Sequence, residues 1–382
     1  MTANRTSTTG STPQSGSVIS GRATAEAAHA FTSRFASGLA GDFYRDLSGL
    51  SVSSIGMGTY LGECDDAEDL RYERLIATGI KRGLNLIDTA INYRCQRSER
   101  AVGRAIRDAI AAGSAARSEV VVCTKAGYVP LEKQPPASRD EYKAYLATEY
   151  FDRGIMSAAD VVAGGHCIKP GFLSNQIERS RANLGVDCID VFYIHNPEQQ
   201  LDVLSRPAFL QVMREAFTEL EANVAAGKIG MYGCATWNGF RVFPANKNYL
   251  SLAELVSAAI DAGGQDHHFG VIQLPVNLAM TEAVRLPSQH DGTTNHSLLE
   301  IARQCEISVI ASAALMQSQL THDLPPAARS LFPDLGTDAQ RAIAFVRSLP
   351  VTSGLVGMRS VEHLDENLGS ARAAIPTPAI RS

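Results

Sequence analysis

The chain has 382 residues, of which 45% are hydrophobic and 20% charged, with a formal net charge of −5 at pH 7. One large core is feasible, because α/β barrels use about 250 residues or more as a single domain. The negative net charge argues against a nucleic-acid partner, because proteins that bind nucleic acids need a basic surface. The apolar runs are too short to span a membrane.

The N-terminal region begins with a stretch rich in serine, threonine and glycine, a composition typical of disordered segments. No apolar segment follows a basic start, which excludes a secretory signal. We therefore expect residues 1–40 to be a disordered or poorly ordered tail and residues 41–382 to be one domain. An organelle transit peptide is a minor alternative. Seven scattered cysteines without a C-x-x-C motif indicate reduced thiols, and hence a cytoplasmic protein.

Strand-like and helix-like segments alternate along the rest of the chain. Short continuous apolar runs, typical of parallel strands covered on both faces, predict strands at 52–57, 84–88, 120–124, 189–194, 229–234, 271–274, 308–311 and 354–357. Helical periodicity predicts helices at 67–82, 99–112, 172–184, 209–226, 251–262, 297–304, 338–348 and 361–373. Eight such pairs predict a single closed (β/α)₈ TIM barrel.

An open doubly wound sheet is the competing fold, but it needs a G-x-G-x-x-G turn after the first strand, and none is found there. The loop after the third strand is very long, reaching about residue 170 with an extra helix near 140–150. Such loops lie on the C-terminal face of a barrel, where active sites are built.

Four ionisable or hydrogen-bonding residues occur at or just past successive predicted strand ends: Asp88, Tyr93, Lys125 and His195. These ends share one face of a barrel, so the side chains can converge. A free tyrosine, with a pKa of about 10, is a poor acid at neutral pH. A lysine ammonium lowers that pKa, a paired aspartate fixes the lysine, and a histidine orients a carbonyl oxygen.

The same segments resemble the aldo-keto reductase family. NLIDTAINYR with SERAVGRAI is similar to its signature, VVVCTK to its lysine segment, and NLGVDCIDVFYIHNPE to its histidine segment. VIQLPVNL and LVGMRSVEHLDENLG resemble two cofactor segments, and the five motifs run in order from about residue 50 to 368. The resemblance implies a (β/α)₈ barrel that binds NADPH, or less often NADH, and interconverts an aldehyde or ketone and its alcohol.

Carried over position by position, the resemblance implies that Tyr93 is the proton donor and that Lys125 and Asp88 set its pKa. It also implies that His195 positions the substrate carbonyl. Gln273 matches the glutamine that binds the nicotinamide amide, and Arg359 the cation facing the 2′-phosphate. The full set of implied cofactor-binding residues is Gly58, Thr59, Asp88, Thr236, Gln273, Ser312, Leu315, Gly357, Arg359, Ser360, Glu366 and Asn367. The implied partner is a small carbonyl or alcohol, with no metal, nucleic acid or membrane.

Three departures from the family pattern concern the cofactor cradle and the substrate. Ala235-Thr236 replaces a Ser-Asn pair, and Ser312 stands where an aromatic residue commonly stacks on the nicotinamide, a loss for which Trp237 could compensate. Arg94 follows Tyr93 where glycine is usual. A cation there favours an anionic or polyhydroxylated, sugar-like substrate, unless it pairs with Glu99.

Two alternatives remain open at this point. One is an NADPH-binding regulatory protein with little turnover, similar to the β subunits of potassium channels. The other is a non-redox acid/base enzyme, a lyase or epimerase, that uses the same tyrosine and lysine. The identity of the substrate and the oligomeric state are not readable from the sequence.

Overall fold

The computed structural model describes residues 17–372 and residue 375. Eight parallel strands close into a barrel in the order β11-β12-β3-β4-β5-β6-β7-β8, as the predicted TIM barrel requires. The strands are β3 (Ile55–Gly58), β4 (Leu86–Asp88), β5 (Val121–Ala126), β6 (Ile189–His195), β7 (Ile229–Ala235), β8 (Phe269–Pro275), β11 (Ser308–Ser312) and β12 (Ser353–Gly357).

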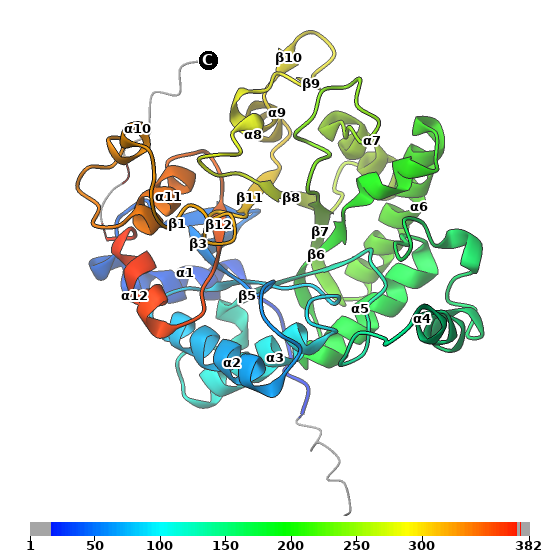
Figure 1. The fold of residues 1–382 in the computed structure, drawn as a ribbon, viewed down its shortest axis with the longest axis horizontal. Coiled ribbons are helices and arrows are strands. Elements are labelled where there is room, and N and C mark those ends of the chain that lie inside the picture. The colour runs from blue at the N-terminus through cyan, green and yellow to red at the C-terminus, as the bar shows by residue number, and fades with distance from the viewer. Residues whose placement is uncertain (1–16, 373–374, 376–382) are drawn as a thin grey trace, which may run out of the picture.

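Helices surround this barrel (Figure 1). The main ones are α2 (Asp66–Lys81), α3 (Arg97–Ala111), α5 (Pro170–Leu184), α6 (Arg206–Ala225), α7 (Leu252–Gly263), α9 (Leu298–Gln304), α11 (Asp338–Arg347) and α12 (Val361–Gly369). Each overlaps a predicted helix, with ends that differ by about one turn or less. Side-chain caps fix several starts: Asp65 accepts a hydrogen bond from Glu68 N, and Ser297 from Glu300 N. Of the described helices, none has both the length and the apolar character needed to cross a bilayer.

The predicted first strand, residues 52–57, is wrong as one element. Residues 50–53 belong to a hairpin of β1 (Tyr44–Leu47) and β2 (Leu50–Ser53), and the barrel strand begins only at Ile55. The side-chain amide of Asn85 accepts the backbone hydrogen of Ser53 at 2.9 Å and ends the hairpin there. Apolar residues of the hairpin pack on the inward-facing side chains of the barrel and so close its N-terminal end.

The expectation of a poorly ordered tail up to residue 40 is corrected for residues 17–40, whereas residues 1–16 lie outside the described part of the chain. Helix α1 (Ala25–Phe35) begins at the cap residue Thr24 and buries Ala28 and Phe31 completely. Burial of this apolar stripe stabilises a helix that composition alone did not indicate.

Long loops extend the C-terminal end of the barrel. The β5–α5 loop holds the predicted extra helix as α4 (Arg139–Leu146) and η3 (Ala147–Phe151), followed by η4 (Ala158–Asp160). The other short elements are η1 (Ala36–Gly38), η2 (Arg117–Glu119), η5 (Pro197–Asp202), α8 (Glu282–Arg285), β9 (Gln289–His290), β10 (Asn295–His296) and α10 (Pro326–Arg329). These loops and the strand ends beneath them build the candidate site.

Candidate active site

The four side chains singled out from the sequence meet at the C-terminal end of the barrel. Asp88 ends β4, Lys125 lies near the end of β5, and His195 ends β6, while Tyr93 follows β4 in a turn. The Lys125 ammonium donates a hydrogen bond to Asp88 Oδ1 and lies 5.1 Å from the centre of the Tyr93 ring. The Tyr93 and His195 ring centres are 6.0 Å apart. Strand order in the barrel produces this convergence.

Lys125 and Asp88 form a buried ion pair. The Lys125 side chain is 1% exposed, and its ammonium also donates to the Thr89 carbonyl at 2.8 Å. The Asp88 charge raises the pKa of Lys125 above its ordinary value, in spite of burial. Burial raises the pKa of Asp88, and the bonds from Lys125 and Gln273 oppose this. Lys125 is therefore a fixed cation beside Tyr93 at neutral pH.

Burial raises the pKa of Tyr93 by more than the Lys125 charge lowers it. This corrects the expectation of a net lowering: the lysine opposes the effect of burial without reversing it. The phenol is consequently protonated at neutral pH, which is the state a proton donor must have before it acts. Tyr60 contacts the same ring edge-on at 5.0 Å.

Burial and the Lys125 charge hold the pKa of His195 well below its usual range. Its imidazole is therefore neutral, and its buried Nδ1 has no hydrogen-bond partner in the described structure. The backbone carbonyl of His195 accepts a hydrogen bond from His166 Nε2 at 2.7 Å, and Gln200 donates to His166 Nδ1 at 2.8 Å. Both ring nitrogens of His166 thus have protein partners.

A cavity of about 470 Å³ opens above these residues. It is lined by strand ends and the loops that follow them: Gly58, Thr59, Tyr60, Leu61, Asp88, Tyr93, Tyr128, His195, Asn196, Ala235, Thr236, Trp237, Gln273, Ser312, Ala313, Ala314, Leu315, Met316, Gln317, Ser318, Leu355 and Gly357. The predicted cofactor residues that lie in, or shortly after, β3, β4, β7, β8, β11 and β12 are among them. Lys125 lies beneath the cavity and does not line it.

Two predicted cofactor residues, Gln273 and Thr236, have other partners in this structure. Gln273 Nε2 donates to Asp88 Oδ2 at 2.7 Å. The Thr236 hydroxyl donates to Glu198 Oε1 at 2.5 Å and accepts from Gly239 N at 2.8 Å. Both residues line the cavity, but the Thr236 hydroxyl already donates its hydrogen to Glu198.

Glu198 is a site residue that sequence reasoning missed. Its Oε1 also accepts the backbone hydrogens of Trp237 and Asn238 at 3.1 and 3.2 Å. The carboxyl is buried, which raises its pKa. It ties the loop after β6 to the loop after β7. The signal was present as a carboxylate three residues after His195, in HNPE.

Four predicted cofactor residues lie outside the cavity, on and before α12. Arg359 is paired with Glu68 Oε2 at 3.1 Å, yet its side chain remains 54% exposed. Ser360 caps α12 through the backbone of His363. Glu366 is half-buried and Asn367 is 3% exposed. Contact of these four residues with a nucleotide stays a prediction.

Arg94 does not supply the cation for substrate binding that the sequence suggested. Its guanidinium donates to Asp69 at 2.6 Å and lies over the Tyr72 ring, with a side chain 1% exposed. It is also not paired with Glu99, which binds Thr124 at 2.6 Å instead. Arg94 is not among the residues that line the cavity, and this removes the argument for an anionic or sugar-like substrate.

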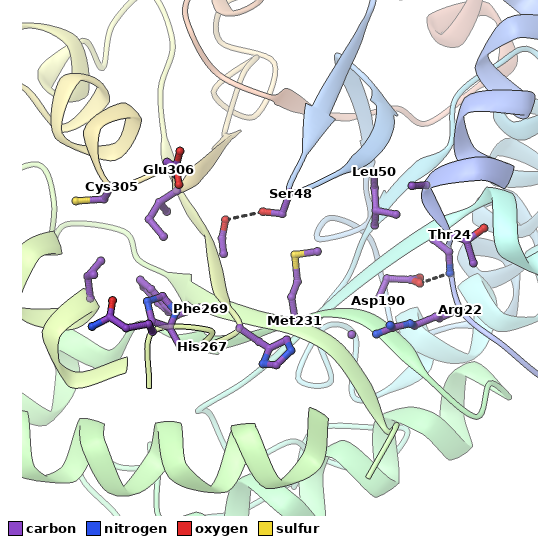
Figure 2. A pocket seen from close by; sticks show the side chains of 18 of the residues that line it. Arg22, Thr24, Ser48, Leu50, Asp190, Met231, His267, Phe269, Cys305 and Glu306 are labelled. Carbon is purple, nitrogen blue, oxygen red and sulfur yellow. Dashed lines mark hydrogen bonds between the residues drawn. The ribbon is translucent and has the colours of Figure 1, made fainter. Parts of the chain in front are cut away.

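A second cavity, of about 760 Å³, lies at the opposite, N-terminal end of the barrel. Among the side chains that line it, Figure 2 shows the hairpin residue Ser48, which donates to the Gly270 carbonyl at 3.1 Å, and Asp190, which accepts Ala23 N at 2.6 Å. None of the four converging side chains lines it. We therefore place the candidate active site at the C-terminal end, where barrel enzymes carry their chemistry.

Comparison with known proteins agrees with this geometry. The model of the aldo/keto reductase family matches residues 54–253, more than half of the chain. The NADH-specific methylglyoxal reductase of Escherichia coli strain K12 is 27% identical over 211 residues, or 54% of each protein. The match thus spans about half the length of this curated relative.

Solved structures share the fold along most of the chain. An aldo-keto reductase from Bacillus halodurans in its holo form has a TM-score of 0.58 at 16% identity, covering 88% of this chain and 92% of that one. An aldo/keto reductase from Klebsiella pneumoniae, in complex with NADP and acetate, has a TM-score of 0.55 at 21% identity, covering 88% and 96%. With its barrel, its converging side chains and its family match, this chain belongs to the aldo/keto reductase family.

Proposed function

We propose that the protein is an NAD(P)H-dependent oxidoreductase that reduces a small, uncharged aldehyde or ketone to its alcohol. The single observation that supports this most is the buried Lys125–Asp88 pair beneath the Tyr93 ring, with His195 at the same cavity. A fixed cation, a protonated phenol and a neutral imidazole are the groups that a carbonyl oxygen needs when it gains negative charge.

The chain's own residues handle the proton. A carbonyl oxygen between Tyr93 and His195 would accept hydrogen bonds from both, and these bonds strengthen as the oxygen becomes an alkoxide. Tyr93 then transfers its phenol proton to that oxygen, and the Lys125 ammonium stabilises the resulting phenolate. Asp88 keeps Lys125 charged and in place throughout.

The residues present fit a nicotinamide dinucleotide. The loop after β11 carries a run of positive-φ residues, Met316, Gln317 and Ser318, which turn its backbone along the cavity. Asn277 holds this loop through the Ala313 carbonyl at 2.9 Å. The cofactor supplies hydride when bound. NADPH is the first expectation, with the exposed Arg359 for its 2′-phosphate, and NADH is the second, as in the name of the Escherichia coli relative.

The charge of the cavity defines the substrate class. Asp88 holds the one carboxyl group among its described lining residues, which include no lysine or arginine, and this carboxyl is paired with Lys125. Tyr60 and Trp237 line the cavity, and these two residues are 58% and 46% exposed. An aromatic, uncharged wall favours uncharged carbonyl compounds, since an anion would lose its hydration without gaining a partner. Methylglyoxal, named for the relative, is the first substrate to test.

The test is reduction of methylglyoxal by the wild type and by Tyr93→Phe, followed as NADPH or NADH oxidation. Loss of the phenol proton should lower kcat by about 100-fold or more, whereas the dissociation constants of both nucleotides, measured by fluorescence, should stay within about threefold. Glyoxylate, an anionic aldehyde, is the matched comparison and should react at least about tenfold less well, a difference of about 1.4 kcal/mol.

Three outcomes would contradict the proposal. Full activity in Tyr93→Phe would remove the proton donor. Tight binding of nucleotide without multiple turnover on any carbonyl of a broad panel would indicate the regulatory alternative. Product formation without added nucleotide would indicate a lyase or epimerase.

A further inference from the structure

Two cysteines that the proposed chemistry does not use lie next to each other beside the active site. Cys64 Sγ and Cys95 Sγ are 3.7 Å apart, although 31 positions separate them in the sequence. A disulfide bond needs a sulfur–sulfur distance of about 2 Å, so the two atoms need to approach by roughly 1.7 Å. Both are free thiols, and no other pair of thiols is in contact within the described part of the chain.

The two cysteines come from the first two βα loops at the mouth of the cavity. Cys64 follows Tyr60 and Leu61 in the β3–α2 loop, and Cys95 lies two residues after Tyr93. A third loop holds both positions: Gln134 Nε2 donates to the Cys64 carbonyl at 2.7 Å, and Lys133 N donates to the Cys95 carbonyl at 3.1 Å. One side-chain bond and one backbone bond from adjacent residues thus hold the two cysteine backbones to the same loop.

The environments of the two thiols differ, and the difference indicates which thiol reacts first with an oxidant. Cys64 is half-buried and can meet a small oxidant, whereas Cys95 is only 6% exposed. Burial and the neighbouring Cys64 and Glu132 raise the pKa of Cys95 to about 12, so it is mostly the neutral thiol. The accessible thiol reacts first, since the thiolate is the nucleophile and access limits its reaction.

We propose that Cys64 and Cys95 are an oxidative modification site that forms a reversible intramolecular disulfide with hydrogen peroxide. The Cys64 thiolate attacks one peroxide oxygen; the S–O bond forms, the O–O bond breaks, and hydroxide leaves and takes up a proton as water. Cys95 then loses its proton and attacks the sulfenic sulfur; the S–S bond forms, and the S–O bond breaks with release of water. Two thiols are oxidised and one peroxide is reduced to two waters.

The bond would join the segments that carry Tyr60 and Tyr93, whose rings are already in edge contact at 5.0 Å. Three consecutive positive-φ residues, Arg94, Cys95 and Gln96, directly follow Tyr93. A cross-link there restrains the turn that sets the position of the phenol. Because closing a loop lowers the entropy of the unfolded chain, the oxidised protein should also be more stable than the reduced one.

The experiment treats the purified full-length protein with hydrogen peroxide, blocks free thiols with iodoacetamide and digests it with trypsin without reductant. Cleavage after Arg45, Arg71, Arg94 and Arg97 gives peptides 46–71 and 95–97. The expected product is these two peptides joined and two hydrogen atoms lighter than their sum. Dithiothreitol should restore both free thiols, and the melting temperature should rise by several degrees on oxidation.

Cys64→Ser should abolish the joined peptide, and Cys305→Ser, which changes another half-buried cysteine, should leave it intact. Tyr93→Phe should form the same bond, so this inference and the proposed carbonyl chemistry can fail separately. Circular dichroism checks that each variant is folded. Overoxidation of Cys64 to a sulfinic acid without the joined peptide, a bond between two molecules, or pairing with a different cysteine would overturn the proposal.

Discussion

At the residue scale, the Lys125–Asp88 pair sets the electrostatics of the site. Replacing Asp88 by Asn keeps the shape but removes the charge that raises the pKa of Lys125. A buried ammonium without its counter-ion loses its proton more easily, by about one to three pH units. We expect the alkaline limb of the pH–rate profile for carbonyl reduction to move to lower pH by that amount, with a reduced kcat.

Asp190 provides the matched control for this substitution. It is equally buried and paired with Arg117 at 2.8 Å, but at the opposite end of the barrel. Asp190→Asn should lower the melting temperature without moving the alkaline limb. Equal shifts of the limb in both variants, or none in Asp88→Asn, would show that the ion pair does not control the ionisation that limits turnover.

The sequence predicted that Asp88, Lys125 and His195 come together at the site, but it did not predict the hydrogen-bond and ion-pair partners of the residues around them. Asp88, Lys125 and His195 could be placed because each lies at or near the end of a strand, and strand ends of a parallel barrel share one face. The orientation of Arg94 could not be placed, because it depends on Asp69, a residue of another element. The same applies to Glu198, whose partners follow a different strand.

At the element scale, the β5–α5 loop holds the backbone of His195 through the hydrogen bond from His166 to the His195 carbonyl. Gly127 shows how closely they pack: an added Cβ there would lie 2.4 Å from the His195 carbonyl oxygen and 2.8 Å from His166 Nε2. We expect His166→Leu to lower kcat by up to about 100-fold, because a small displacement of a reacting group has a cost of that order. The dissociation constant for nucleotide, measured by fluorescence, should change little.

His166→Gln should restore most of the rate, because its amide can still donate to the His195 carbonyl. A loss of rate in the glutamine variant as large as in the leucine variant would indicate that the loop packs against the barrel without positioning His195. A parallel rise in the nucleotide dissociation constant would indicate general damage to the site.

Element prediction succeeded where apolar periodicity was strong and failed where tertiary contacts decide. Seven barrel strands were indicated by short apolar runs, and the eighth, β3, matches only the last part of the predicted run 52–57. The β1–β2 hairpin was missed because Arg45 and Asp46 interrupt its pattern; Arg45 reaches instead to the Val351 carbonyl at 2.6 Å. Helix α1 was missed because its stability depends on burying Phe31 against the rest of the molecule.

At the scale of the whole molecule, the barrel buries ionisable groups whose effects on stability oppose each other as the pH falls. Burial raises the pKa values of Asp88, Glu99 and Glu198, so the folded state binds protons more readily there and gains stability in acid. Burial lowers the pKa values of His166 and His195, and these imidazoles destabilise the folded state in acid.

A comparison of the wild type with His166→Gln isolates one of these contributions, because the other groups are common to both proteins. Burial lowers the pKa of His166 from its ordinary 6.5 to about 4. Between these pH values the unfolded chain binds a proton at this position that the folded chain does not, so folding stability falls as the pH falls. From pH 7.5 to 4.5, the wild type should lose roughly 2.5 kcal/mol more of its unfolding free energy than the variant. Urea unfolding at the two pH values measures the difference, and equal losses in the two proteins would mean that position 166 is already protonated, or accessible to water, in the folded barrel.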